Sequence, residues 1–319
     1  PYPLKPPCNP GLARCAKPCH SAAMYAAKQN NPALAAALIG AATAFIAATT
    51  LLAKMLGTDT LGPPLHPLQI SHGRFLFAFV SIAMIATAVR PVLGKPHWGL
   101  HIGRTLSGWL GVTLMFASVA FIPLSDATAI TFLNPAFAMI LAIPLLGERV
   151  GHIRWSAAAI ALAGAMILLR PAPDSFQPAA LLALGAAMIM GLELVFIKKL
   201  TRRENPFQIL LVNNTLGVCI ASVAVVSVWQ VPTPAQWGAL AALGILMATA
   251  QALFVNGMAR ADASFVAPFS YATLVFATLY DFAVFDVIPD GISVLGSMII
   301  LAGALLLAMR ESQLRRKRT

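Results

Sequence analysis

Ten apolar runs, each of roughly 20 residues, follow one another along this chain and constrain its fold more than any other feature. A helix needs about 20 such residues to cross the ~30 Å hydrocarbon core of a membrane. Runs such as residues 33–48 are apolar on every side, which argues against the alternating pattern of a β-barrel. The sequence therefore predicts an all-α integral membrane protein with ten transmembrane helices. The predicted spans are residues 33–55, 65–89, 99–121, 123–146, 153–169, 177–197, 206–229, 236–257, 263–285 and 291–309.

Composition supports the same class, because 59% of the residues are hydrophobic and only 10% are charged. Soluble domains carry about 25% charged residues. Eighteen of the 22 Lys and Arg residues fall on one side of the membrane if the N-terminus is placed in the cytoplasm. Basic residues gather on the cytoplasmic side, so we expect both termini there, in an inner (plasma) membrane of the bacterial type.

The net charge of +11 is then explained by topology, and no nucleic-acid partner is needed. The basic tail, residues 311–319, is expected to touch anionic lipid headgroups. Residues 1–32 are expected to form an N-terminal cytoplasmic extension. Cys8, Cys15, Cys19 and His20 lie in this extension without paired C-x-x-C spacing, so we predict no metal site.

The apolar part of the chain consists of two similar halves. Asp126-Ala-Thr-Ala opens a stretch that runs past Pro135, and Asp262-Ala-Ser-Phe opens a similar stretch that runs past Pro268. The predicted repeats are residues 33–170 and 177–310, with five spans each. An odd number of spans makes the second repeat enter the membrane from the opposite side, so the repeats are inverted. Such a pair is expected to expose a central site to either face in turn.

Two segments carry a resemblance to a known family. Residues 124–135 with Leu146-Gly-Glu-Arg149, and residues 262–271 with 285–289, are similar to segments of EamA-type members of the drug/metabolite transporter superfamily. The resemblance covers residues 33–310. It implies a ten-helix secondary carrier for small metabolites, often exporting amino acids or toxic compounds. One departure is that no glutamate follows the ninth span as Glu148 follows the fourth, which implies that the two halves are not mechanically identical.

Amino-acid export is thus the leading interpretation, and it rests on the resemblance. Uptake of a vitamin or nucleoside-type metabolite is the alternative. A polytopic membrane enzyme and a channel are alternatives of other classes. The motifs of zincins, P-loop ATPases and serine hydrolases do not occur in the sequence, so we expect neither an enzyme nor a cofactor. The expected partners are a small-molecule substrate and the lipid bilayer, with protons as the candidate coupling ion.

Ionisable groups inside spans are costly and point to function. Arg74 in the second span is a candidate for holding a substrate carboxylate, and the alternative is an arginine that reaches the headgroups. His72 is a weaker candidate, with a structural role as its alternative. Glu193 and Asp281 are the candidate coupling carboxylates. Their alternatives are an ion pair between Glu193 and Lys198 or Lys199, and an interfacial position for Asp281.

Polar groups near prolines mark a candidate lining. Pro135 and Pro268 are predicted to interrupt helices at related places in the two repeats, either at a wet cavity or at a packing kink. Asn213 and Asn214 lie about 100° apart on a helix, so at most one is expected to face a cavity. The remaining candidates for substrate contact are Trp109, Asn134, Gln251, Ser270 and Tyr271.

Overall fold

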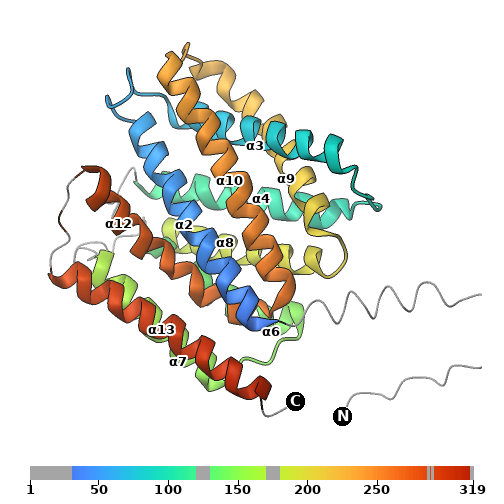
Figure 1. Cartoon of the computed structure of the whole chain (residues 1–319), viewed down its shortest axis with the longest axis vertical. Helices are drawn as coiled ribbons and strands as arrows, with labels where there is room; N and C mark the ends of the chain where they lie inside the picture. The colour runs from blue at the N-terminus through green and yellow to red at the C-terminus, as the bar shows by residue number, and fades with distance from the viewer. Residues whose placement is uncertain (1–30, 120–129, 170–179, 286–287, 289–290, 317–319) are drawn as a thin grey trace, which may run out of the picture.

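The computed structural model of the chain describes residues 31–119, 130–169, 180–285, 288 and 291–316. Every apolar run within these residues is helical (Figure 1). The helices are α2 (Pro32–Leu56), α3 (Pro67–Val89), α4 (Trp98–Val119), α6 (Asn134–Leu146), α7 (His152–Leu169), α8 (Ala180–Thr201), α9 (Pro206–Val225), α10 (Pro234–Arg260), α12 (Ala272–Phe285) and α13 (Gly291–Arg316), with short segments η2 (Val226–Val228), α11 (Ala263–Val266) and η3 (Ala267–Tyr271).

Within the described ranges, six helical segments are long and apolar enough to cross a membrane by length and composition. They begin at Pro32, Pro67, Ala180, Pro206, Pro234 and Ala263. Residues 134–146, 152–167 and 294–306 form shorter apolar helices. The first part of the predicted fourth span, with the Asp126 motif, falls in residues 120–129 and lies outside the described residues.

Local sequence explains where several helices begin. Proline occupies the first turn of α2, α3, α9 and α10, where its missing N–H costs no hydrogen bond. The residue before each of these prolines caps the helix: Asn31, His66, Asn205 and Thr233 each accept a hydrogen bond from a backbone N–H of the first turn. Helix α6 ends at Gly147, whose φ of +68° suits glycine.

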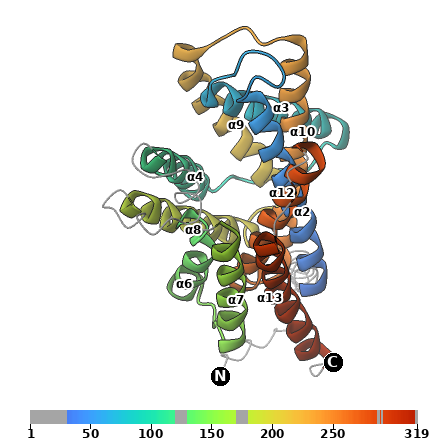
Figure 2. The same cartoon turned by 90° about the vertical axis from the view of Figure 1, so that its left-hand side faces the viewer.

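Helix packing follows an internal two-fold pattern. Helix α2 packs on α10 as α4 packs on α8, and α12 packs on α2 as α6 packs on α8. The pairs α7 with α13 and α3 with α9 each join equivalent helices of the two repeats. Figure 2 shows α4 and α8 projecting together, away from α3, α9 and α10. One contact departs from the pattern, since α3 packs extensively on α10 whereas the equivalent pair, α9 and α4, makes little contact.

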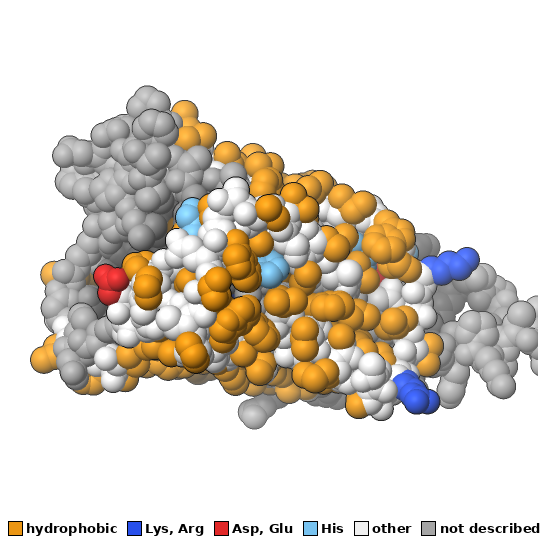
Figure 3. Space-filling view, turned by 90° about the horizontal axis from the view of Figure 1, so that it is seen from above, with side chains coloured by type: hydrophobic (Ala, Val, Ile, Leu, Met, Phe, Trp, Pro, Cys, Tyr) orange, Lys and Arg blue, Asp and Glu red, His pale blue; other side chains and the backbone are white. Residues whose placement is uncertain are grey.

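The outer surface is apolar, as expected of helices in lipid. Met84, Leu181 and Val223 are 61%, 69% and 79% exposed. Hydrophobic side chains are spread over the described part of the face seen in Figure 3, and the Lys and Arg side chains visible there lie at one end of it. Apolar surface of this extent is unfavourable in water and favourable against lipid tails.

Loops at each end of the bundle tie the two repeats together. The basic end holds residues 90–97, 147–151, 202–205 and 261–262. Hydrogen bonds across the repeats join these loops to each other and to the adjoining helix ends: His97 to Glu204, Asn205 to Val92, Arg202 to Leu146 and Arg154 to Asp262. The central group of the basic end is Glu148, 7% exposed, which accepts hydrogen bonds from the backbone N–H groups of Ala263 and Ser264 at 2.9 and 3.0 Å. The opposite end holds residues 57–66 and 229–233, joined through hydrogen bonds of Gln69, Thr233 and Gln236.

Candidate substrate-binding cavity

A cavity of about 430 Å³ lies between the two repeats. Helices α2, α3, α4 and α6 of the first repeat line it together with α8, α9, α10, η3 and α12 of the second. Its volume falls within the ~300–1,000 Å³ usual for small-molecule sites. Because no single repeat encloses this space, any relative movement of the repeats changes its shape.

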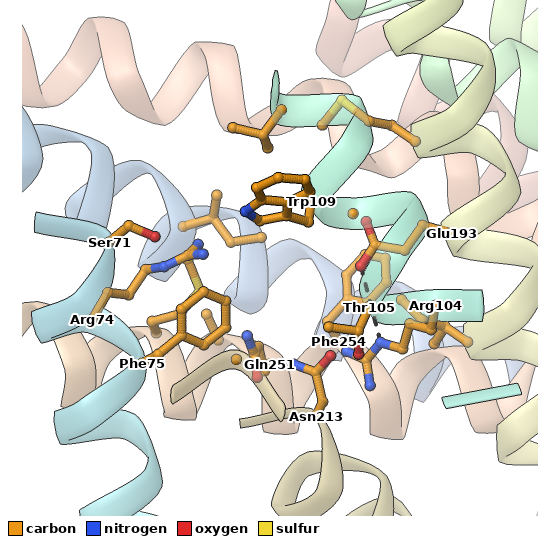
Figure 4. Close-up of a pocket in the computed structure, with 18 of the residues that line it drawn as sticks. Ser71, Arg74, Phe75, Arg104, Thr105, Trp109, Glu193, Asn213, Gln251 and Phe254 are labelled. Atoms are coloured by element: carbon orange, nitrogen blue, oxygen red, sulfur yellow. Dashed lines mark ion pairs between the residues drawn. The ribbon is translucent and has the colours of Figure 1, made fainter. Parts of the chain in front are cut away.

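Three charged side chains line the cavity, namely Arg74 on α3, Arg104 on α4 and Glu193 on α8 (Figure 4). Arg104 Nε lies 4.0 Å from Glu193 Oε1, and the two side chains are 4% and 27% exposed. Arg74 also acts electrostatically on Glu193. Two guanidinium groups thus face one carboxylate, which leaves a net positive charge and favours substrates with electron-rich groups.

Aromatic side chains give the same cavity flat apolar walls. Phe75, Trp109, Phe132 and Phe254 belong to its lining. Figure 4 shows Arg74 between Phe75 and Trp109, and the Arg74 guanidinium carbon lies 4.4 Å from the centre of the Phe75 ring. Flat aromatic walls beside cations are suited to a planar ring that carries polar substituents.

Amide side chains complete the polar lining. Asn134, Asn213 and Gln251 all face the cavity, and Ser270 joins them from η3. Asn214 is fully buried and donates to Leu210 O at 2.8 Å and to Gln251 Oε1 at 2.9 Å. The two neighbouring asparagines therefore divide their roles, with Asn213 toward the cavity and Asn214 toward α10.

Both candidate prolines lie where the regular α-helix is interrupted. Residues 132–133 form a turn before α6, and Pro135 occupies the first turn of that helix. Pro268 lies in η3, where the backbone narrows to a 3-10 helix before α12. Asn134 and Ser270, beside these two prolines, line the cavity.

Other sequence candidates lie elsewhere. His72 packs edge-on against Trp229, with the ring centres 5.9 Å apart, and it is not part of the cavity lining. Tyr271 is fully buried in an apolar cluster with Leu274 and Ile300. The side chain of Asp281 lies outside the described part of the chain. The predicted site residues that do meet in one cavity are Arg74, Trp109, Asn134, Glu193, Asn213, Gln251 and Ser270.

Sequence reasoning missed Arg104, although the available signal was the same as for Arg74: an arginine within an apolar run. The sequence offered an ion pair of Glu193 with Lys198 or Lys199 as the alternative to a coupling role, and the structure gives Glu193 a different neighbour. Lys198 turns instead toward α10 and donates to the carbonyls of Met258 and Ala261. Glu193 therefore has Arg104, and not Lys198, as its neighbouring cation.

The described residues contain no group of three or more His, Cys, Asp or Glu side chains that could hold a metal ion. The cysteines and histidine of the N-terminal extension, considered above, lie in residues 1–30, outside the described residues.

Comparisons with known proteins match both halves of the chain. The EamA-like transporter family model matches residues 33–170 and 177–309. A riboflavin transporter of Rhizobium johnstonii is 34% identical over 218 residues, which cover 68% of this chain and 72% of the relative. An S-adenosylmethionine uptake transporter of Rickettsia bellii is 25% identical over 284 residues, covering 89% and 98%. A solved crystal structure has a TM-score of 0.70 at 23% identity, covering 88% of this chain and 98% of its own.

Proposed function

Because the chain belongs to the EamA-like transporter family, we propose that it carries a neutral or anionic metabolite with a planar ring, of the riboflavin kind, into the cell. The membership makes it a small-molecule transporter of the membrane with ten helices and two EamA repeats. The observation that carries the substrate class is the cavity itself, where aromatic walls meet two arginines and a single carboxylate.

Charge separates the candidate substrates. The described lining carries two guanidinium groups and one carboxylate. S-adenosylmethionine bears a permanent sulfonium cation, which this surplus of positive charge repels. Riboflavin is uncharged at neutral pH, and the carbonyl oxygens on its ring can accept hydrogen bonds from arginine. The higher identity to the riboflavin transporter, 34% against 25%, supports the same choice.

These relatives support the uptake of a vitamin-type metabolite better than amino-acid export, which was the leading expectation from the sequence. One relative is named for uptake and the other for riboflavin, and neither for an amino acid. Amino-acid export remains the second candidate, because Arg74 and Arg104 are also suited to a carboxylate.

The two repeats, residues 33–170 and 177–310, are the units whose relative movement would open the cavity to one face and then to the other. The basic end would face the cytoplasm, since basic loops are retained there. A reporter fused after residue 319 that is active only in the periplasm should then stay inactive, and activity of that reporter would reverse this orientation.

Counterflow in proteoliposomes tests the substrate class. Vesicles preloaded with riboflavin should transiently accumulate labelled riboflavin, and vesicles preloaded with S-adenosylmethionine or tryptophan should not. Trp109→Leu should weaken riboflavin transport roughly tenfold through the loss of ring stacking. Trp155→Leu on α7, outside the cavity lining, is the matched control and should transport normally. An overshoot with tryptophan and none with riboflavin would replace this proposal by amino-acid transport.

A further inference from the structure

Arg104 lies in the cavity wall, and two of its three guanidinium nitrogens are buried without a hydrogen-bond partner in the described residues. The residue is 3% exposed, and neither Nε nor Nη1 has a hydrogen-bond partner among the described residues. The nearest carboxylate oxygen, Glu193 Oε1, is 4.0 Å from Nε, beyond hydrogen-bond length. Buried donors of this kind almost always have an acceptor, so Arg104 is suited to bind one brought by a ligand.

Glu193 occupies a niche that a glycine creates. A Cβ atom placed on Gly108 would lie 3.0 Å from both Cδ and Oε2 of Glu193. The carboxylate therefore packs against the bare backbone of α4, one turn from Arg104. The Glu193 side chain is also the more exposed member of the pair, at 27% against 4%. Of the two groups, the carboxylate is the one with room to move.

We propose, building on the proposed function, that Arg104 binds an electron-rich group of the substrate, such as a ring carbonyl or an anion, in exchange for Glu193. Glu193 then takes up one proton from water as it loses Arg104. The substrate and a proton thus enter the site together, and both leave when Glu193 returns to Arg104. With a neutral substrate the site gains one positive charge, because protonation neutralises Glu193 while Arg104 stays charged. With a substrate that carries one negative charge, the charge of the site is unchanged.

Few other charges compete for Glu193. Helices α6 and α9 and the short α11 pack against α8 and contain no charged residue. The charged residue of α10 is Arg260, at its basic end, where it bonds to Asn256. Arg74 on α3 is the other cation near Glu193. It lies farther away than Arg104, which is the partner within 4.0 Å among the described residues. A carboxylate that loses this partner inside the bilayer is costly, and protonation removes the cost.

The test is riboflavin affinity as a function of pH, measured by fluorescence quenching on the purified full chain between pH 5 and 8.5. In the wild type, Kd should rise with pH, by up to tenfold per unit where one proton is taken up. Glu193→Gln should bind tightly with no pH dependence. Arg104→Gln should bind at least tenfold more weakly at every pH. Arg203→Gln, an exposed arginine at the basic end, is the matched control and should behave as the wild type.

Gly108→Ala separates position from charge. It pushes the Glu193 carboxylate off α4 without removing it, so riboflavin affinity at high pH should rise while part of the pH dependence remains. The inference is overturned if Glu193→Gln keeps the wild-type pH dependence, or if Arg104→Gln binds riboflavin as well as the wild type. If Arg104→Gln does not fold, Arg104→Lys, which keeps the charge but loses the fork, should show the same weakening in part.

Failure of the proposed function has a different signature. If the wild type binds S-adenosylmethionine or tryptophan and not riboflavin, the proposed substrate class is wrong. The pH dependence of the Kd for the solute that does bind then tests whether it replaces Glu193 at Arg104. If none of the three binds, infrared spectroscopy decides whether Glu193 depends on Arg104. Arg104→Gln should then show a protonated carboxyl band at neutral pH that the double variant Arg104→Gln/Glu193→Gln lacks, and absence of this band overturns the inference.

Discussion

The second helix of each repeat begins with the same short pattern, and the two copies hold opposite ends of the molecule. Pro67-Leu68-Gln69 begins α3 and Pro206-Phe207-Gln208 begins α9. Gln69 exchanges two hydrogen bonds with the backbone of Gln230, in the loop after α9. Gln208 accepts a 2.7 Å hydrogen bond from the backbone N–H of Gly94, in the loop after α3. We call these two contacts the Gln69 latch and the Gln208 latch.

The chemistry around the two latches differs. Gln208 also donates to Glu204 at 2.7 Å, and this carboxylate accepts hydrogen bonds from the backbone and the ring of His97 and from the ring of His101. The Glu204 side chain is 2% exposed. Around the Gln69 latch the partners are neutral, with Gln236 bonded to the carbonyl of Pro63. The two copies thus share one contact geometry, and the Gln208 latch includes a carboxylate whereas the Gln69 latch joins neutral groups.

The helices beyond the latches also differ. On the Gln69 side, α3 and α10 pack so closely that a Cβ atom on Gly244 would lie 2.4 Å from Cβ of Phe77. On the Gln208 side, α4 and α9 make little contact, and both line the cavity. Two equivalent helix pairs thus adopt two different arrangements in one molecule. This is the asymmetry expected of inverted repeats that share one central site.

The largest effect is expected from forcing apart α3 and α10, the closely packed pair of helices. Gly244→Ala places a methyl group against the backbone and Cβ of α3, so the two helices must separate. We expect a loss of about 3 kcal/mol, at the upper end for overpacking, seen as a lower apparent Tm in detergent. Gly238→Ala on the same helix is the control, because its added methyl meets nothing within 4 Å. It should leave Tm unchanged or raise it. Equal losses in both variants would contradict the close packing.

The next effect tests the charged latch. Glu204→Gln keeps the shape of the side chain but replaces the charged carboxylate, whose oxygens accept hydrogen bonds from both histidines, by a neutral amide. We expect a loss of about 2 kcal/mol, as for hydrogen bonds to charged groups. Thermal unfolding at pH 7 measures this loss. A variant as stable as the wild type would show that the carboxylate contributes nothing to the basic end.

Acid should weaken the same latch selectively. Burial raises the pKa of Glu204, but hydrogen bonds from the His97 backbone N–H and from the rings of His101 and His97 outweigh burial and set that pKa below its usual value. A carboxyl with a lowered folded pKa stabilises the protein above its unfolded pKa, about 4.3, and this contribution is lost as pH falls through the folded pKa. Between pH 7 and pH 3, the stability measured by thermal unfolding should therefore fall less steeply with decreasing pH for Glu204→Gln than for Gln69→Leu.

The smallest effect compares the latches directly. Gln69→Leu leaves the N–H and C=O of Gln230 without their partner. Gln208→Leu leaves the Gly94 N–H without its acceptor and removes one of the two donors to Glu204 Oε2, the other being His101. Each variant should lose about 1–2 kcal/mol at pH 7. Salt should change only the Gln208→Leu result, because that variant alone disturbs a charged group. Thermal unfolding in low and high salt measures the difference, and equal salt dependence would mean that the latches do not differ electrostatically.

Much of the fold follows from the sequence because the bilayer leaves few choices. An apolar run in lipid must satisfy every backbone hydrogen bond within itself, so residues such as 206–225 had to form a helix. Prolines that follow a capping residue mark the first turn of several helices, within a few residues of the predicted starts. The repeated Pro-x-Gln pattern is also visible in the sequence, but its role appears only when each glutamine meets the loop of the other repeat.

The sequence by itself determined the class of protein, the number of spans, the duplication, and Arg74 and Glu193 as costly groups within spans. Only the tertiary structure decided which polar groups share a cavity. It brought Arg104 of α4 to Glu193 of α8 and turned Lys198 away, and it assigned Asn213 to the cavity and Asn214 to α10. The reason is physical: the hydrophobic pattern fixes which residues lie in the membrane, but in apolar helices it does not fix how each helix is rotated. Rotation is set by packing, here by the close fit of glycines such as Gly108 and Gly244 against the neighbouring helix.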